Sequence, residues 1–537
     1  MKPDLSGLDP LHVNLAQRLN VGDGFARAAA MFPDRAAVVD RGESVTFAKM
    51  ANASRSLGGA LLDLGCAHQS PVTMFMGNSW RFLATYMACA SAGLVAMPVN
   101  VLLSTADLAW ILTDAGTETV VADAMFVPSL EAVLPQVERV RRVVIVGEEQ
   151  DKAMTVAGRP VLRWEDLAGT SDARAVEVLV DDRDTVQCLY TSGTTSQPKG
   201  VLVSHASVLV ATLTNALAMD NRNWSSEPDV IMNVLPLFHT TALNTLALPF
   251  LLTGGTVVLP GPFEPAGFVE SIQRYRTTHL MLLPVMWRAV VAALAAAPHE
   301  TASVRKAIYA MAPMGADLLE LVDQAFPNAA VILGSGQTEV VPATVLQWPE
   351  HRHTAVNSWG PSVPSVLTRC LAVDGSVLPP GETGEIAYRS PHVSSGYWNN
   401  RDANTVAFAH GWFHSGDVGH VDEAGVVWFT DRIKDIIKTG GENVSSVDVE
   451  RVVTSVPGVA ECSVVGLPDD RWGEAVCAVV IPDGTVPAAE LPERVIAYTK
   501  SHLAGFQVPK RVFVVEQLPK TATGKTRKHE LRDLLRS

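Results

Sequence analysis

The stretch Tyr190-Thr-Ser-Gly-Thr-Thr-Ser-Gln-Pro-Lys199-Gly200 is the strongest local signal in the sequence. A strand-like run precedes it over residues 185–190, and Val201-Leu-Val follows it. Its small hydroxyl residues and glycines can direct backbone N–H and side-chain O–H groups into one concavity beside a lysine charge, as a polyphosphate requires. The stretch is not a Walker A loop, because Lys199 precedes the glycine. It predicts a phosphate-binding loop between two strands, but taken alone it also fits an ordinary flexible loop.

The chain on either side of this stretch alternates between strand and helix patterns. Short β-branched runs such as Ala36–Asp40 alternate with segments that repeat apolar residues at helical spacing, such as Phe47–Leu64. Ser104 is placed to cap a helix over Thr105–Ala115. This alternation predicts parallel sheets covered by helices.

The pattern changes in the last third of the chain. Over residues 363–429, turns such as Pro379-Pro380-Gly381 separate short strand-like runs, which indicates a β-rich subdomain. The charged segment Arg432-Ile433-Lys434-Asp435 then precedes a compact α/β unit. In that unit Ser445 and Asp448 resemble a helix capping box. We therefore place a domain boundary near Lys434.

Composition excludes several classes of protein. The chain has 537 residues, 47% of them hydrophobic and 18% charged, which is typical of a globular protein and not of a disordered chain, a collagen or a coiled coil. Its 42 Lys and Arg residues against 56 Asp and Glu residues leave a net charge of −14. Because binding to a polyanion depends on Lys and Arg, this acidity argues against nucleic acid as a partner. Any phosphate group must therefore be bound by a local cluster of positive charge and not by the protein's overall charge.

The sequence carries no signal for export or for stable insertion into a membrane. Its six cysteines are scattered without the C-x-x-C spacing of a zinc or redox site, as in a reduced protein. The first residues contain acids and prolines where a signal peptide has an apolar run. Two apolar stretches, 234–260 and 281–298, are interrupted by prolines and polar residues, so we expect them to be buried core, with transient contact with a membrane as the alternative. We expect a cytoplasmic protein.

Further motifs follow the phosphate loop in a fixed order. They are Leu235-Pro-Leu-Phe-His239, Gly336-Gln-Thr-Glu339, Gly384-Glu385-Ile with Gly396-Tyr-Trp398, Trp412-Phe-His-Ser-Gly-Asp417, Asp431-Arg432-Ile-Lys434-Asp435, Lys438-Thr-Gly-Gly441 and Pro519-Lys-Thr-Ala-Thr-Gly-Lys525. With these motifs in register, the sequence resembles the adenylate-forming (ANL) superfamily, in its branch of acyl-CoA synthetases and fatty-acid–CoA ligases. The resemblance covers essentially the whole chain.

The resemblance implies an α/β fold with two domains. A large N-terminal AMP-binding domain, residues 1–433, would contain two helix-flanked sheets and the β-rich subdomain at 363–429. A small α+β domain, residues 434–537, would be mobile. The implied activity is that of an AMP-forming carboxylate–CoA ligase, with ATP, Mg²⁺ and coenzyme A as cofactors. A free carboxylate is a poor electrophile, so the enzyme would form an acyl-AMP before transferring the acyl group to the CoA thiol.

The resemblance also assigns catalytic and nucleotide-binding residues. Lys525 matches the lysine that bridges the substrate carboxylate and the α-phosphate, and His239 matches a residue that gates the acyl pocket. Lys199 belongs to the phosphate loop. Glu339 resembles the magnesium ligand, with Thr191 as a second contributor. The other expected nucleotide ligands are Ser192, Gly193, Thr194, Thr195, Gln337, Thr338, Arg432 and, for the ribose hydroxyls, Asp417.

Transfer to CoA is implied to require rotation of the C-terminal domain about Lys434. Lys525 would leave the site, and Gly440 and Gly441 would line a passage for pantetheine, because a backbone without Cβ can approach a ligand closely. The expected contacts of CoA are Trp472, Phe506 and Lys510. Three places depart from the family pattern. Ser335 replaces the aromatic residue that usually stacks on adenine, and Val508 stands where some relatives carry arginine near the CoA phosphate. The segment Ala310-Met-Ala-Pro-Met-Gly315 has Ala and Met where Gly and Ala are common.

The expected acyl pocket contains no charged side chain. Beside His239, its lining is expected from Thr240, Thr241, Asn244, Met311, Ala312, Gly334, Gly336 and Val340. We therefore expect a small-molecule carboxylic acid with an uncharged, mainly apolar tail, a medium- or long-chain fatty acid first and an aryl or cyclic acid second. An acyl-carrier protein is the alternative acceptor, and a catalytically silent nucleotide-binding protein is a third hypothesis. The sequence does not distinguish a monomer from a homodimer.

Overall fold

The strands that border the predicted phosphate loop belong to a nine-stranded, mainly parallel sheet. The structure is a computed structural model that describes residues 3–147, 155–169, 176–191, 197–310, 314–520 and 526–536. In edge-to-edge order, the sheet contains β20 (Gly396–Tyr397), β10 (Lys199–Ser204), β9 (Thr185–Thr191), β4 (Val95–Pro98), β3 (Pro71–Phe75), β5 (Thr119–Asp123), β6 (Arg142–Val146), β8 (Arg159–Arg163) and β7 (Thr155–Val156). Strands β9 and β10 pair antiparallel, with Lys199 opposite Thr191.

A second large sheet has eight strands. In order, they are β16 (Ala343–Gln347), β15 (Ala330–Gly336), β14 (Lys306–Ala310), β13 (His279–Leu282), β11 (Val230–Met232), β12 (Thr256–Leu259), β1 (Ala36–Asp40) and β2 (Glu43–Thr46). The inner strands β1 and β11 to β15 are parallel, and β2 and β16 pair antiparallel at the two edges. This architecture follows from the β-branched, apolar runs, which bury both faces of a strand.

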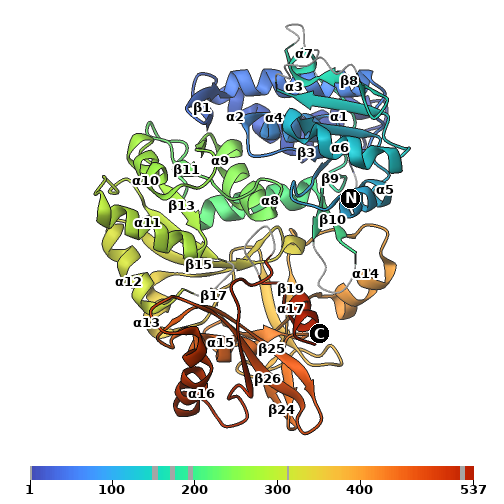
Figure 1. The fold of residues 1–537 in the computed structure, drawn as a ribbon. Helices are drawn as coiled ribbons and strands as arrows, with labels where there is room; N and C mark the ends of the chain where they lie inside the picture. The colour runs from blue at the N-terminus through green and yellow to red at the C-terminus, as the bar shows by residue number, and fades with distance from the viewer. Residues whose placement is uncertain are drawn as a thin grey trace.

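Helices cover both sheets and fill the space between them (Figure 1). In chain order they are α1 (Pro10–Gln17), α2 (Val21–Met31), α3 (Phe47–Asp63), α4 (Trp80–Ser91), α5 (Thr105–Asp114), α6 (Val127–Val133), α7 (Trp164–Ala168), α8 (His205–Ala218), α9 (Leu248–Thr253), α10 (Pro265–Arg274), α11 (Pro284–Ala296), α12 (Ala316–Ala325), α13 (Pro349–Thr354) and α14 (Arg401–Ala407). One apolar cluster joins α2, α3, α4, α8 and α9 to strands of both sheets. Separate clusters place α5 and α6 on the outer face of the first sheet and α10 to α12 on that of the second.

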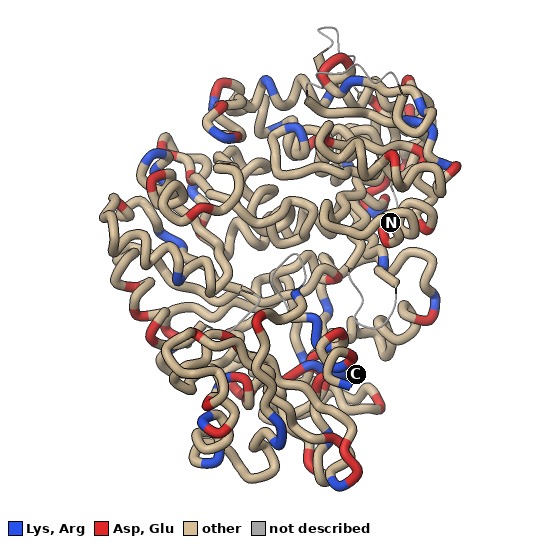
Figure 2. The backbone as a smooth tube through the Cα atoms, in the orientation of Figure 1, with Lys and Arg blue, Asp and Glu red and all other residues tan. Residues whose placement is uncertain are grey.

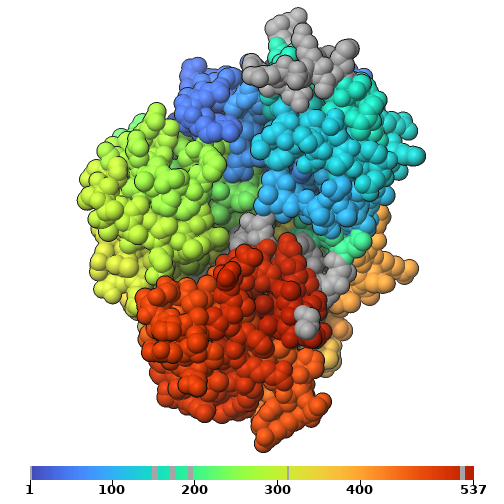
Figure 3. Space-filling model, in the orientation of Figure 1, coloured from blue at the N-terminus to red at the C-terminus, as the bar shows by residue number. Residues whose placement is uncertain are grey.

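The last third of the chain forms two smaller sheets. The first is antiparallel, in the order β17 (Gly360–Pro361), β22 (Val426–Arg432), β21 (Phe413–Val421), β19 (Gly384–Arg389) and β18 (Leu367–Leu371). The second contains β24 (Glu442–Val444), β23 (Ile437–Thr439), β26 (Gly473–Pro482), β25 (Val459–Asp469) and β27 (Arg511–Val514), with helices α15 (Ser446–Thr454), α16 (Leu491–His502) and α17 (Lys528–Arg536). In the space-filling view this last unit, orange to red, abuts the larger part along a seam (Figure 3).

The predicted fold class is confirmed: two helix-flanked sheets, a β-rich portion and a separate C-terminal domain. Predicted caps are also present, since Ser104 and Ser445 accept hydrogen bonds from the N–H groups of Asp107 and Asp448. The boundary between 433 and 434 stays a prediction. No helix in the described ranges is long and apolar enough to cross a membrane.

One expectation about burial was wrong. Residues 281–298 were expected to be core, yet α11 buries only Trp287 and Val290, and Val285 is 69% exposed. The helix is rich in alanine, which fits a surface and a core equally well, so composition did not reveal which face packs. The stretch 234–260 is buried as expected over the helical residues 241–251.

Candidate active site

Lys199 and Glu339 lie in or beside strands of different sheets, yet both contact the same residue, Tyr397. Lys199 begins β10, whereas Glu339 lies in a short helix, η4 (Thr338–Val340), directly after β15. Tyr397 of β20 lies between them. Its hydroxyl donates to Glu339 Oε1 at 2.9 Å, and Lys199 Nζ lies 5.3 Å from the centre of its ring. Burial, and then the Glu339 charge, raise the pKa of Tyr397, so the hydroxyl stays protonated as a donor.

The backbone around Glu339 is held by contacts from outside its short helix. The N–H of Ser394 donates to the Glu339 carbonyl at 2.7 Å, and His392 Nδ1 lies 2.8 Å from the Val340 carbonyl. Gly336 ends β15, and it allows the Pro342 carbonyl to approach closely, because a Cβ there would collide with that carbonyl. The first position of the Gly-x-Thr-Glu motif is therefore glycine for a steric reason, since no side chain fits there.

Asp417 lies at the centre of a second predicted group. Its side chain is buried, and Gln337 Nε2 donates to Oδ2 at 2.6 Å. Arg432 is directly opposite Asp417 in the β21–β22 pairing, and its Nε lies 2.6 Å from Oδ1. A carboxylate has about four acceptor sites, so it retains capacity for hydroxyl donors such as those of a ribose. The structure thus brings together three of the residues expected to bind the nucleotide.

A network of hydrogen bonds fixes the turn that carries Asp417. Glu385 Oε1 accepts from the N–H of Gly416 at 2.9 Å, and Oε2 lies 2.8 Å from His414 Nδ1. Gly416 has φ +72°, the left-handed region that favours glycine. The hydroxyl of Ser415 accepts from the N–H of Asp417 at 3.0 Å. The Gly-Glu motif of β19 and the Ser-Gly-Asp motif of β21 are therefore parts of one structure.

His239 ends a segment whose backbone is held by Asn78. Asn78 Nδ2 donates to the Leu235 carbonyl at 2.8 Å, and its Oδ1 accepts from the N–H of Leu237 at 2.8 Å. Nδ1 of His239 accepts from the N–H of Thr241 at 3.3 Å, which leaves the ring proton on Nε2. Burial lowers the pKa of His239 to about 4, so the ring is neutral at pH 7. The gating role expected for His239 stays a prediction.

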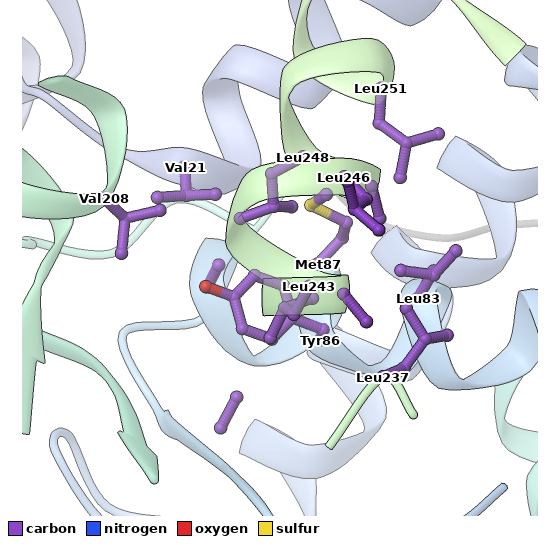
Figure 4. Close-up of a cluster of buried hydrophobic side chains, with 14 of the residues drawn as sticks. Val21, Leu83, Tyr86, Met87, Val208, Leu237, Leu243, Leu246, Leu248 and Leu251 are labelled. Atoms are coloured by element: carbon purple, nitrogen blue, oxygen red, sulfur yellow. The ribbon is translucent and has the colours of Figure 1, made fainter. Parts of the chain in front are cut away.

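Polar side chains of the expected acyl pocket bond to one another. Thr240 and Asn244 flank the start of a π-helix (Thr241–Ala247), and the Thr240 hydroxyl donates to Asn244 Oδ1 at 3.0 Å. Gln187 exchanges two hydrogen bonds with Asn244, of 3.1 and 3.0 Å, and also accepts from the Tyr86 hydroxyl at 2.8 Å. Around the π-helix, leucine side chains and the Tyr86 ring fill the space (Figure 4). Asn244, Gln187 and Tyr86 have no exposed surface.

The remaining pocket residues differ in burial. Gly334 and Gly336 lie on β15, Thr241 is buried, and Val340 is completely buried in the main apolar cluster. Ser335 lies between the glycines, and its carbonyl accepts from the Thr344 hydroxyl at 3.3 Å.

The residues expected to contact CoA form a separate group in the C-terminal unit. Lys510 Nζ lies 5.3 Å from the centre of the Trp472 ring, and the N–H of Gly440 donates to the Trp472 carbonyl at 2.7 Å. Phe506 is 39% exposed. Gly440 and Gly441, with φ +60° and +88°, form the two-residue turn of the β23–β24 hairpin. This hairpin lies at the end of the unit remote from β15 (Figure 1), so the CoA group is apart from the nucleotide group in this arrangement.

Lys434 lies in an exposed turn between the two parts of the chain. Before it, Asp431 Oδ2 accepts from the N–H and the hydroxyl of Ser446 at 2.6 and 2.7 Å. After it, Arg532 of α17 donates to Asp435 at 2.9 Å. Charges of both signs gather here around α17 (Figure 2). The expected hinge is thus bordered on both sides by charged contacts.

Several expected site residues lie outside the described part of the chain. They are Ser192, Gly193, Thr194 and Thr195 of the phosphate loop, Met311 and Ala312 of the pocket, and Lys525. The roles expected for them stay predictions. Thr191, at the edge of the described part, has its hydroxyl 3.5 Å from the Lys199 carbonyl oxygen.

The described residues fit a magnesium ion held mainly by a nucleotide. Mg²⁺ usually binds one or two protein carboxylates and takes its other ligands from phosphates and water. Glu339 offers one carboxylate, oriented by Tyr397. Among the described residues there is no group of three or more His, Cys, Asp and Glu side chains that could hold a metal by themselves.

Sequence reasoning missed the residues that orient the site. Tyr397 and Glu385 were visible in motifs, but no role followed from the residues themselves. Asn78 gave no local signal, because its partner Leu235 is 157 positions away.

Comparison with known proteins identifies the class of enzyme. The family of AMP-binding enzymes matches residues 25–398, and the AMP-binding enzyme C-terminal domain matches residues 448–525. The chain is 32% identical over 524 residues to feruloyl-CoA synthase of an Amycolatopsis species, covering 95% of this chain and 98% of that protein. It is 31% identical over 538 residues to a long-chain-fatty-acid–CoA ligase of Thermus thermophilus, covering 96% of both.

Solved structures agree with this assignment. An anthranilate CoA ligase in complex with anthranoyl-AMP has a TM-score of 0.86 and 25% identity, covering 97% of this chain and 99% of that one. The o-succinylbenzoate CoA synthetase of Bacillus subtilis, in complex with ATP and magnesium, has a TM-score of 0.80 and 26% identity, covering 96% and 99%. The chain belongs to the AMP-binding enzyme family. Within that family it is an AMP-forming acyl-CoA synthetase, which activates an acyl or aryl acid by adenylation and uses ATP and CoA as substrates.

Proposed function

We propose that the acid has an uncharged, compact tail, an aryl or cyclic acid first and a medium- or long-chain fatty acid second. The observation that carries this proposal is the buried network of Tyr86, Gln187 and Asn244 behind Thr240. These side chains occupy the space between the π-helix, α4 and β9, and a long chain would have to displace them. The network supports a short pocket, which reverses the order of substrates expected from the sequence. The similarity to feruloyl-CoA synthase and to anthranilate CoA ligase supports the same order.

The fatty acid remains the second candidate for a specific reason. The chain is almost equally identical to a long-chain-fatty-acid–CoA ligase, at 31%. The pocket positions that the structure describes also carry no charged group that would reject an aliphatic tail.

The proposed mechanism assigns a task to each described group. Lys199 neutralises phosphate charge. Asp417, oriented by Gln337 and Arg432, accepts hydrogen bonds from the ribose hydroxyls. Bound Mg²⁺ would supply further positive charge at the phosphates through Glu339. The neutral His239 ring borders the acid and excludes water from it without transferring a proton. These groups position and stabilise the reactants for attack of the carboxylate on the α-phosphate.

The test is acid-dependent pyrophosphate exchange across a panel of benzoates, cinnamates, indoleacetate and straight-chain acids from C6 to C16. We expect the highest kcat/KM with an aryl acid and a steep fall beyond medium chain length. CoA and a holo-acyl-carrier protein would then be offered separately, with CoA as the expected acceptor. Preference for C14 or C16 acids would reject the compact pocket, and no exchange with any acid would reject the enzyme's proposed substrate class.

Asn244→Ala should widen the pocket. It removes the amide that closes the space beside Gln187, so the ratio of kcat/KM for dodecanoate to that for benzoate should rise about 10-fold, as one or two extra methylenes are accommodated. Asn223→Ala is the matched control, because Asn223 is equally buried but is bonded to Thr253 and Asp229. An unchanged ratio in Asn244→Ala, with a melting temperature like that of the control, would contradict the network's role.

A further inference from the structure

Tyr397 stands between two expected ligands of opposite charge. Its hydroxyl donates to Glu339 Oε1 at 2.9 Å, and its ring centre is 5.3 Å from Lys199 Nζ. No ion pair within the described ranges joins Lys199 to Glu339. Tyr397 therefore contacts both groups, the ammonium through the face of its ring and the carboxylate through its hydroxyl.

The backbone that carries this ring is held by contacts on several sides. The Asn404 side chain bonds to both backbone groups of Tyr397, accepting from its N–H at 2.7 Å and donating to its carbonyl at 2.9 Å. Tyr397 is opposite Val201 in the pairing of β20 with β10, the strand that Lys199 begins. Ser394, three positions earlier, binds the Glu339 carbonyl. The segment 394–397 thus contacts both β10, the strand that Lys199 begins, and the backbone of Glu339.

We propose that Tyr397 is a positioning residue for adenylation, which holds Glu339 toward the metal and Lys199 toward the phosphates and prevents the two from pairing. This inference rests on the proposed function of the site. A direct Lys199–Glu339 pair would consume the two charges that magnesium-bound ATP needs. The hydroxyl fixes the carboxylate by a hydrogen bond, and the face of the ring attracts the ammonium without neutralising it.

Two substitutions separate the two contacts. Tyr397→Phe removes only the hydroxyl, so calorimetric titration with ATP should show Mg²⁺ enhancing binding about 10–100-fold less than in the parent, with ATP binding in EDTA little changed. Tyr397→Leu also removes the ring and should weaken ATP binding in EDTA by a further ~3-fold. In exchange assays, Tyr397→Phe should raise the KM for Mg²⁺ and leave the KM for the acid unchanged.

A double-mutant cycle with Glu339→Gln makes the test independent of general folding effects. If Tyr397 acts through Glu339, Tyr397→Phe should have no further effect on Mg²⁺-dependent ATP binding in the Glu339→Gln background. Tyr275→Phe, at the end of α10, is the control and should match the parent. An unchanged Mg²⁺ dependence in Tyr397→Phe, or effects that simply add in the double variant, would overturn the inference. A parent that binds ATP with Mg²⁺ but exchanges no pyrophosphate with any acid would reject the proposed substrate class and not the role of Tyr397.

Discussion

Replacing Lys525 with alanine should abolish acyl-AMP formation while sparing thioester formation from supplied acyl-AMP. The carboxylate must attack the α-phosphate of a polyanion, and the family resemblance places the Lys525 ammonium where that charge develops. Loss of one preorganised donor to a developing charge costs about 10²–10³ in rate, and here the donor also carries a full charge, so exchange should fall by at least ~10³-fold. The measurement is pyrophosphate exchange beside release of acyl-CoA from synthetic acyl-AMP.

Lys520→Ala is the matched control for this experiment. Lys520 belongs to the same basic segment, but its ammonium is paired with Glu461 at 2.7 Å. If Lys525 were one more solvated lysine of the tail, the two variants would behave alike. Equal loss of both half-reactions in Lys525→Ala would contradict a role confined to adenylation.

From the sequence, residues could be assigned to the site only where they belong to a recognisable motif. Gln337, Asp417 and Arg432 come from separate motifs and lie together, because Arg432 is opposite Asp417 in the β21–β22 pairing and Gln337, just after β15, donates to Asp417. Their roles toward the nucleotide stay predictions. The layered sheets could be predicted from β-branched runs alternating with helical periodicity. In each case the information lies within one element and its flanking residues.

Contacts between distant segments could not be predicted. The Asn78 side chain binds the backbone of Leu235 and Leu237, and a backbone accepts any side chain of suitable shape, so no residue type at the partner position reveals the pair. The π-helix at 241–247 is invisible in the sequence because its apolar residues point in all directions. The bulge that lets Glu385 reach Gly416 depends on the register of β19 and β21, which local patterns do not determine.

Lys434→Pro should leave adenylation nearly intact and slow transfer to CoA. The nucleotide group and the expected CoA group are apart in this structure, with the Gly440-Gly441 turn remote from β15 (Figure 1), so one arrangement cannot serve both half-reactions. Proline fixes φ at its own position and restricts the residue before it, here Ile433, whose N–H donates to the Gly416 carbonyl at 2.9 Å. Hinges work through a few residues that absorb large changes in φ and ψ.

The expected size follows from the equilibrium between the two orientations. If proline disfavours the second orientation by about 3 kcal/mol, thioester formation should slow about 100-fold, with pyrophosphate exchange unchanged within about 3-fold. Lys434→Ala separates backbone from charge, because it removes the ammonium and keeps φ free, and it should retain most of the transfer rate. Rapid-quench measurement of acyl-AMP formation and decay in the presence of CoA distinguishes the steps, since the proline variant should accumulate acyl-AMP. Unchanged overall turnover in Lys434→Pro would mean that the chain rotates elsewhere, and the contacts of Asp431 with Ser446 and of Arg532 with Asp435 would then be the next places to seek the pivot.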